Sequence, residues 1–171
     1  MSRLLVFLAV LSLLAAPAAM NAAEKSRDRA KSKDEKQDEN QPGPSEIRKK
    51  AERAVARKKD AATHTYHSGD TAKFIPAEFP SDLNDADMLD GIVLGWLRSQ
   101  RIGLGDDLPA GSYIVYLRKV NVKWHVYYTD EDGHIQQRSK DVSYDKDKDY
   151  NPPSFRQNGA AIGYSHWEFT F

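Results

Sequence analysis

The sequence of 171 residues contains no cysteine. A disulfide framework is therefore excluded, and so is a lipid-modified cysteine at a processing site. The chain also lacks an Asn-x-Ser/Thr acceptor for N-linked glycans. Small domains from the secretory pathways of multicellular organisms are often rich in disulfides. For an exported chain, these two absences together favour a bacterial periplasm or exterior as its location.

The sequence has no apolar run of the roughly 20 residues that a helix needs to cross a membrane. A shorter apolar run, residues 4–16, follows Arg3 and precedes small residues, with cleavage expected after Ala18 or Ala23. A basic start, a short apolar run and small residues are the three parts of a secretory signal peptide. We therefore interpret residues 1–23 as a signal peptide, and we expect an exported protein without a transmembrane segment in the mature chain.

Residues 24–44 have almost no apolar side chains and end in a Pro-Gly-Pro sequence. They cannot bury enough surface to offset the entropy lost on ordering, so we predict a disordered, charged linker. Residues 45–62 are rich in helix formers, with Ser45 as a cap, but they carry only a narrow stripe of small apolar side chains. We expect a marginal, exposed helix there.

The formal net charge is zero, but the charges are unevenly divided. Residues 24–59 carry 13 Lys and Arg against 8 Asp and Glu, whereas residues 60–171 carry 11 against 17. The N-terminal arm is therefore basic and the following domain acidic. Because acidic residues are interspersed through the arm, its positive field is weak. We expect a solvated spacer and no specific nucleic-acid partner.

The densest β-forming residues lie between positions 108 and 140. A Pro- and Gly-containing turn at 108–111 precedes a strand that begins near Ser112. In the next strand Val122, Trp124, Val126 and Tyr128 alternate with polar side chains, which is typical of a sheet with one buried face and one wetted face. A polar turn at 130–133 leads to a third strand at 135–139. These signals predict a three-stranded antiparallel meander.

Two further elements are predicted on either side of this meander. Asn84 can cap a helix, and Leu89, Ile92, Val93 and Trp96 recur at spacings of three and four, so we predict a helix over residues 84–101. Alternating aromatics predict a final strand over residues 163–171. The expected fold of residues 68–171 is therefore a small α+β domain, in which one main helix packs on a four-stranded, mostly antiparallel sheet.

The predicted polar face of that sheet carries the candidate binding residues Tyr116, His125, Tyr127 and His166. Tyrosines exposed on a sheet commonly bind peptides, glycans or proteins, because each has an apolar ring and a polar tip. The alternation places His125 and His166 on this same face if their strands are neighbours. Histidine with nearby Glu168 is also the most enzyme-like combination in the sequence, although no hydrolase motif accompanies it.

Two groups of residues are candidates for a metal site. His64 and His67 could share one face of a helix at i, i+3, and neutral imidazoles suit nickel, copper or zinc. Asp145, Asp147 and Asp149 place oxygen atoms at every second position, as in calcium-binding loops, but the intervening lysines oppose cation binding.

The leader and polar linker are followed by three short motifs in order: Gly69-Asp70, Leu108-Pro109-x-Gly111 and Asp132-Gly133-x-Ile135. This order is similar to that of small periplasmic proteins of the nickel/cobalt-efflux accessory family. The resemblance implies a periplasmic accessory protein of metal-ion homeostasis.

The sequence favours an exported, non-catalytic binding domain whose partner is a protein or an envelope polymer. The metal-homeostasis accessory is the alternative, and a small hydrolase is the second alternative. No cofactor is expected beyond the metal ion of the first alternative.

Overall fold

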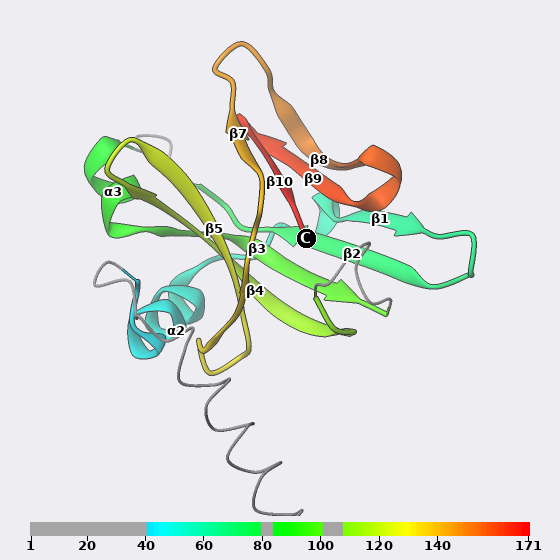
Figure 1. The fold of residues 1–171 in the computed structure, drawn as a ribbon, viewed down its shortest axis with the longest axis horizontal. Coiled ribbons are helices and arrows are strands. Elements are labelled where there is room, and N and C mark those ends of the chain that lie inside the picture. Colours follow the sequence, from blue (N-terminus) through cyan, green and yellow to red (C-terminus); the bar gives the residue numbers. More distant parts are fainter. Residues whose placement is uncertain (1–40, 80–83, 101–107) are drawn as a thin grey trace, which may run out of the picture. The chain divides into compact units, whose positions relative to one another are not determined.

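The computed structural model describes residues 41–79, 84–100 and 108–171. Two antiparallel sheets dominate this part of the chain (Figure 1). The strands of the larger, six-stranded sheet follow one another in chain order: β1 (Ala62–Thr65), β2 (Thr71–Pro76), β3 (Ile92–Ser99), β4 (Gly111–Val120), β5 (Lys123–Thr129) and β6 (Ile135–Arg138). The smaller sheet has the order β7 (Val142–Tyr144), β10 (Trp167–Thr170), β9 (Ala161–Ser165) and β8 (Tyr150–Arg156).

Short helical segments connect or flank the strands of the described residues. They are α2 (Pro44–Arg53), η1 (Lys58–Asp60), α3 (Asp85–Asp90) and η2 (Gln157–Gly159). No helix within the described ranges is long and apolar enough to cross a membrane.

The predicted α+β fold, with one helix on a four-stranded sheet, is wrong because the described residues are mostly strand and form two sheets. The meander within it is confirmed, since β4, β5 and β6 pair in sequence as antiparallel neighbours. Val126 and Tyr128 are fully buried as expected, whereas Val122 lies exposed between β4 and β5. The predicted final strand is a hairpin of β9 and β10 that turns at residues 165–166.

The predicted helix over residues 84–101 begins as expected but ends at Asp90. Asn84 caps it by accepting hydrogen bonds from the backbone N–H groups of Ala86 and Asp87. Gly91 then adopts a φ of 89°, and the chain continues as β3. Val93 and Leu94 are buried on opposite faces of β3, so the first part of this strand is apolar at consecutive positions. Arg101 lies outside the described residues.

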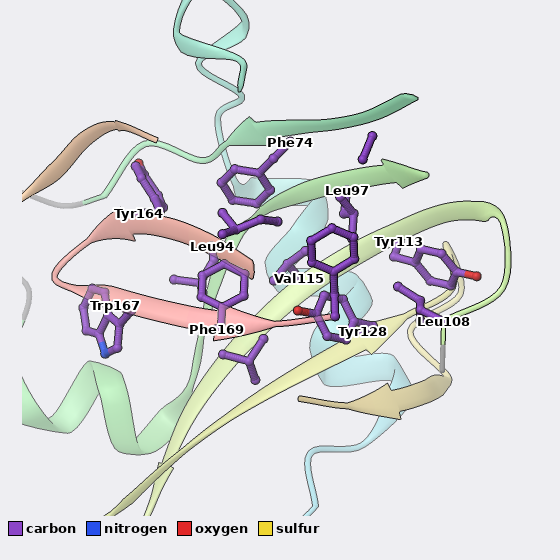
Figure 2. Packing of buried hydrophobic residues seen from close by; sticks show 14 of the residues in the cluster. Phe74, Leu94, Leu97, Leu108, Tyr113, Val115, Tyr128, Tyr164, Trp167 and Phe169 are labelled. Atoms are coloured by element: carbon purple, nitrogen blue, oxygen red, sulfur yellow. The ribbon is translucent and has the colours of Figure 1, made fainter. Parts of the chain in front are cut away.

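A core of buried side chains joins the two sheets (Figure 2). From the larger sheet it takes Phe74, Leu94 and Val115, and from the smaller sheet it takes Trp167 and Phe169. Burying one such large apolar side chain stabilises the fold by about 1.5 to 3 kcal/mol. The smaller sheet is therefore an integral part of the folded domain.

Helix α2 covers part of the opposite face of the larger sheet. Its Ile47 is fully buried, and a second cluster joins it to Val93, Tyr116 and Tyr127. Pro44 stands in the first turn, where its missing N–H costs no hydrogen bond. The helix occupies Pro44–Arg53, a shorter range than the predicted 45–62, and it is anchored to the sheet through Ile47.

Candidate functional site

Two of the predicted binding residues, Tyr116 and Tyr127, lie on the face of the larger sheet that α2 covers. Their exposed fractions are 0% and 1%, so neither ring offers a surface to a partner. The Tyr116 hydroxyl lies 3.0 Å from Glu46 Oε1 and 2.9 Å from the Asp90 carbonyl oxygen. Burial, and then the nearby Glu46 charge, raises the pKa of Tyr116 well above its usual range. These tyrosines hold α2 in place.

The two predicted binding histidines belong to different sheets. His125, in β5, stacks beside Tyr127 with ring centroids 6.2 Å apart. His166 lies in the turn between β9 and β10, where its Nδ1 is 2.5 Å from the Lys148 carbonyl oxygen. The strands β5 and β10 are not paired, so the four predicted binding residues do not form one surface.

The predicted metal ligands are also dispersed. His64 lies in strand β1 rather than in a helix, and its ring packs on those of Tyr66 and Phe155 at 4.7 and 5.7 Å. His67 follows in the turn after β1. One Asp145 carboxylate oxygen accepts the N–H of Asp147, in the turn that also contains Asp149. Among the described residues, no three His, Asp or Glu side chains gather into a group that could hold a metal ion.

The part of the larger sheet beside α2 remains open and forms a groove of about 540 Å³. We call it the α2 groove. Its floor is Ile75, Trp96 and Ile114, which are aligned across β2, β3 and β4. Ile75 and Trp96 are partly exposed. Ala51 of α2 forms the adjacent wall. Ile114 is buried, so the accessible apolar side chains of the floor are those of Ile75 and Trp96.

One end of the α2 groove is basic. Lys73 and Arg98 are directly opposite each other on β2 and β3, and Arg98 is opposite Ser112 on β4. All three side chains are exposed. Like charges at directly opposed positions destabilise a sheet by up to about 1 kcal/mol. Glu131 and Asp132 also line the groove, and Asp132 is paired with Arg48 of α2 at 3.4 Å.

Contacts at both ends of α2 fix the wall of the α2 groove. Near its C-terminal end, Lys50 Nζ lies 2.5 Å from Asp90 Oδ2 and donates to the Gly91 carbonyl oxygen at 2.7 Å. Near its N-terminal end, Pro44 touches Gly133 so closely that a Cβ on Gly133 would lie 2.2 Å from the Pro44 carbonyl oxygen. The groove is therefore largely preformed.

A second hollow, of about 740 Å³, lies beside the hairpin of β9 and β10. We call it the aromatic cleft. Rings from several parts of the chain line it: Phe79, Tyr144, Tyr164, His166 and Trp167. Its polar lining residues are Arg57, Glu78, Asn151 and Ser165. The volume lies within the range of about 300 to 1,000 Å³ that is usual for small-molecule sites.

No family model, curated protein or solved structure matches this chain.

Ser165 occupies a strained position in the aromatic cleft. It is the first residue of a two-residue turn, because Tyr164 and Trp167 are directly paired, and its φ is 52°. Positive φ at this position alone is the pattern of a type II′ turn, which favours glycine. A left-handed conformation costs an ordinary residue about 1 to 2 kcal/mol. The hairpin therefore keeps a hydroxyl group in the cleft at some cost in stability.

Trp167 also lines the cleft, and its side chain contains a buried hydrogen-bond donor. Its side chain is 2% exposed, and its Nε1–H has no hydrogen-bond partner among the described residues. Leaving a buried donor unpaired costs about 1 to 3 kcal/mol. Since an indole N–H can only donate, an acceptor atom would relieve this cost.

The sequence reasoning included His166 among the candidates but missed both hollows. Trp96 and Arg98 were assigned to a helix, which hid their alignment with Ile75 and Lys73. The alternation of Lys73 and Ile75 with buried Ala72 and Phe74 was the one local signal for the open sheet face.

Proposed function

We propose that this chain is an exported, non-catalytic binding domain that holds a polypeptide segment in the α2 groove. The segment carries an apolar side chain followed by carboxylates. The observation that carries the proposal is the alignment of two rows on one open sheet face. The Ile75, Trp96 and Ile114 row is apolar, and the adjacent row contains the opposed cations Lys73 and Arg98.

The charges of the basic end support an anionic partner. Carboxylates placed between Lys73 and Arg98 would replace a repulsion within the sheet by two charge-assisted hydrogen bonds. The apolar row supports a partner side chain at its centre. Trp and Arg are among the residues that contribute most to binding energy in protein interfaces, and here Trp96 and Arg98 are two residues apart on one strand.

Export is tested by the mass of the protein isolated from the cells that produce it. The signal-peptide interpretation predicts a mature chain that starts at Ala19 or Glu24, recovered from the cell envelope or the medium. Cell fractionation shows the compartment of the protein, and intact-mass spectrometry of each fraction shows its first residue. Recovery of the full chain from Met1 in the cytoplasm would refute export and leave the binding proposal to the second test.

The α2 groove is tested by placing a photo-cross-linking amino acid at Ser112 in the producing cells. Ser112 is exposed at the basic end, so a bound segment should form an adduct of discrete mass. Reversing both charges by Lys73→Glu and Arg98→Glu should reduce the yield to background, because the partner's carboxylates would then be repelled. Mass spectrometry of the adduct identifies the linked peptide.

Two matched controls make this result specific. The cross-linker at Ser143, which is also exposed but lies on β7 of the smaller sheet, should give no such adduct. The pair Lys123→Glu and Lys146→Glu changes the net charge by the same amount outside the groove and should leave the yield unchanged. Equal adducts at Ser112 and Ser143, or equal losses of yield in both charge variants, would show that the α2 groove is not the binding surface.

A further inference from the structure

We infer that the aromatic cleft is a second binding site, separate from the α2 groove, and that its ligand is an uncharged saccharide. The two hollows have no lining residue in common. The cleft has a different chemistry from the groove, because aromatic rings alternate with neutral polar groups around it.

The charges of the cleft favour a neutral ligand. Arg57 is its cationic lining residue, and its Nη2 lies 2.5 Å from Asp60 Oδ2. Glu78 is exposed on the same lining. An anion would meet Glu78 and find Arg57 already paired with Asp60, and a cation would meet Arg57. A ligand without charge avoids both costs.

The rings and polar groups suit the two kinds of surface that a sugar ring presents. Its C–H faces pack on aromatic rings, and its hydroxyl groups both donate and accept hydrogen bonds. Tyr144 is 45% exposed at the cleft, and its ring lies 5.5 Å from that of Trp167. Asn151 and Ser165 each offer a donor and an acceptor from neighbouring strands.

Two features that cost stability meet in this cleft. Ser165 holds a hydroxyl group where the turn favours glycine, and Trp167 keeps an unpaired indole N–H. Backbone strain and unsatisfied buried donors concentrate at functional sites. A saccharide hydroxyl or acetamido oxygen can accept a hydrogen bond from the indole N–H of Trp167 once the side chains that cover this N–H move aside. Met88, which lines the cleft, is unbranched and can change rotamer to admit it.

The experiment titrates the ¹⁵N-labelled protein with three neutral trisaccharides: triacetylchitotriose, cellotriose and maltotriose. Binding of any one should produce a saturable shift of the Trp167 indole N–H signal in ¹H–¹⁵N spectra. Trp167→Phe keeps an aromatic ring but removes the donor, and it should weaken binding at least tenfold. Trp96→Phe makes the same change in the α2 groove and should leave the affinity for the saccharide unchanged.

Ser165→Gly is the second variant, since the turn favours glycine and the fold should persist. It should melt at the same or a higher temperature and bind the saccharide several-fold more weakly. A Trp167 signal that stays in place with all three sugars at about 10 mM, a concentration that detects even millimolar affinity, would overturn the inference. Equal losses of saccharide affinity in Trp167→Phe and Trp96→Phe would also overturn the inference. Neither result would alter the cross-linking at Ser112.

Discussion

Gly95→Ala is expected to lower the free energy of unfolding by about 3 kcal/mol or more, or to prevent folding. Gly95 has a φ of 155°, and a Cβ there would lie 2.3 Å from the Ile75 carbonyl oxygen. That oxygen belongs to the backbone of β2, the strand paired with β3, so it cannot move aside without disrupting the sheet. The ring of Phe74, 2.9 Å from the same point, closes the space further. Urea denaturation followed by circular dichroism measures the change.

Gly43→Ala is the matched control for this substitution. Gly43 has a φ of −72°, and no atom lies within 4 Å of the Cβ that alanine would add. Gly43→Ala should lower the free energy of unfolding by less than about 1 kcal/mol. The small loss is expected because Gly43 is the N-cap of α2, and alanine is a poorer N-cap than glycine. If the two variants lost equal stability, β2 and β3 would not approach as closely at Gly95 as the structure has them.

The second large effect is expected at alkaline pH. Burial raises the pKa of four tyrosines above the ordinary value of 10.0: Tyr113, Tyr116, Tyr128 and Tyr164. For Tyr164, hydrogen bonding to Arg57 opposes part of this rise. In the folded protein these side chains keep their protons, whereas in the unfolded chain they ionise near pH 10. Their contribution to the free energy of unfolding is therefore complete below pH 10 and is lost as the pH rises above 10.

We expect the free energy of unfolding to fall steeply with pH because several buried tyrosines act together. Each tyrosine that stays neutral in the fold and ionises in the unfolded chain lowers the free energy of unfolding by about 1.4 kcal/mol per pH unit. Urea denaturation at a series of pH values from 8 to 12 measures the slope.

Tyr128→Phe should reduce the slope of the free energy of unfolding against pH by about 1.4 kcal/mol per pH unit, which is the contribution of one proton. The variant should also lose stability at neutral pH, since the Tyr128 hydroxyl donates to the Thr170 carbonyl oxygen at 2.6 Å. A free energy of unfolding that stays constant from pH 9 to 12 would contradict the burial of these hydroxyl groups.

The two hairpins that β4, β5 and β6 form could be predicted because their signals are local. Asp130 is an example: its carboxylate accepts from the backbone N–H groups of Asp132 and His134 and so defines the turn between β5 and β6. Alternation in β5 likewise identified Val126 and Tyr128 as core residues. Turn and alternation depend on residues close in sequence. The turn and the burial of Val126 and Tyr128 are confirmed, whereas the face expected to be wetted is buried at Tyr127 and Thr129.

The error at residues 84–101 has a physical cause. Leu89, Ile92, Val93 and Trp96 have the spacing of a helix face, but a strand buried on both sides is also apolar at consecutive positions. Only the packing of other elements on both faces of the segment distinguishes a buried strand from a helix. Val93 faces the cluster below α2, and Leu94 faces the core between the sheets. The sequence alone does not contain that information.

The binding face was misplaced for a related reason. Alternation correctly puts Tyr127 on the face opposite Val126, but it cannot tell that α2 covers that face. The aromatic cleft depends on still more distant residues, since Arg57, Phe79, Tyr144 and Trp167 come from four separate segments. Local patterns identify such side chains one at a time, and only the fold brings them together.

The position of β10 has a consequence for the order in which the domain is built. Strand β7 pairs only with β10 among the described strands, although β8 and β9 lie between them in the chain. As the polypeptide emerges, each strand of the larger sheet meets its partner at once. Strand β7 has no partner strand until β10 is synthesised, and the core side chains that pack on Trp167 and Phe169 are uncovered until then. A nascent chain of this protein is thus exposed to aggregation and proteolysis until residues 167–170 arrive.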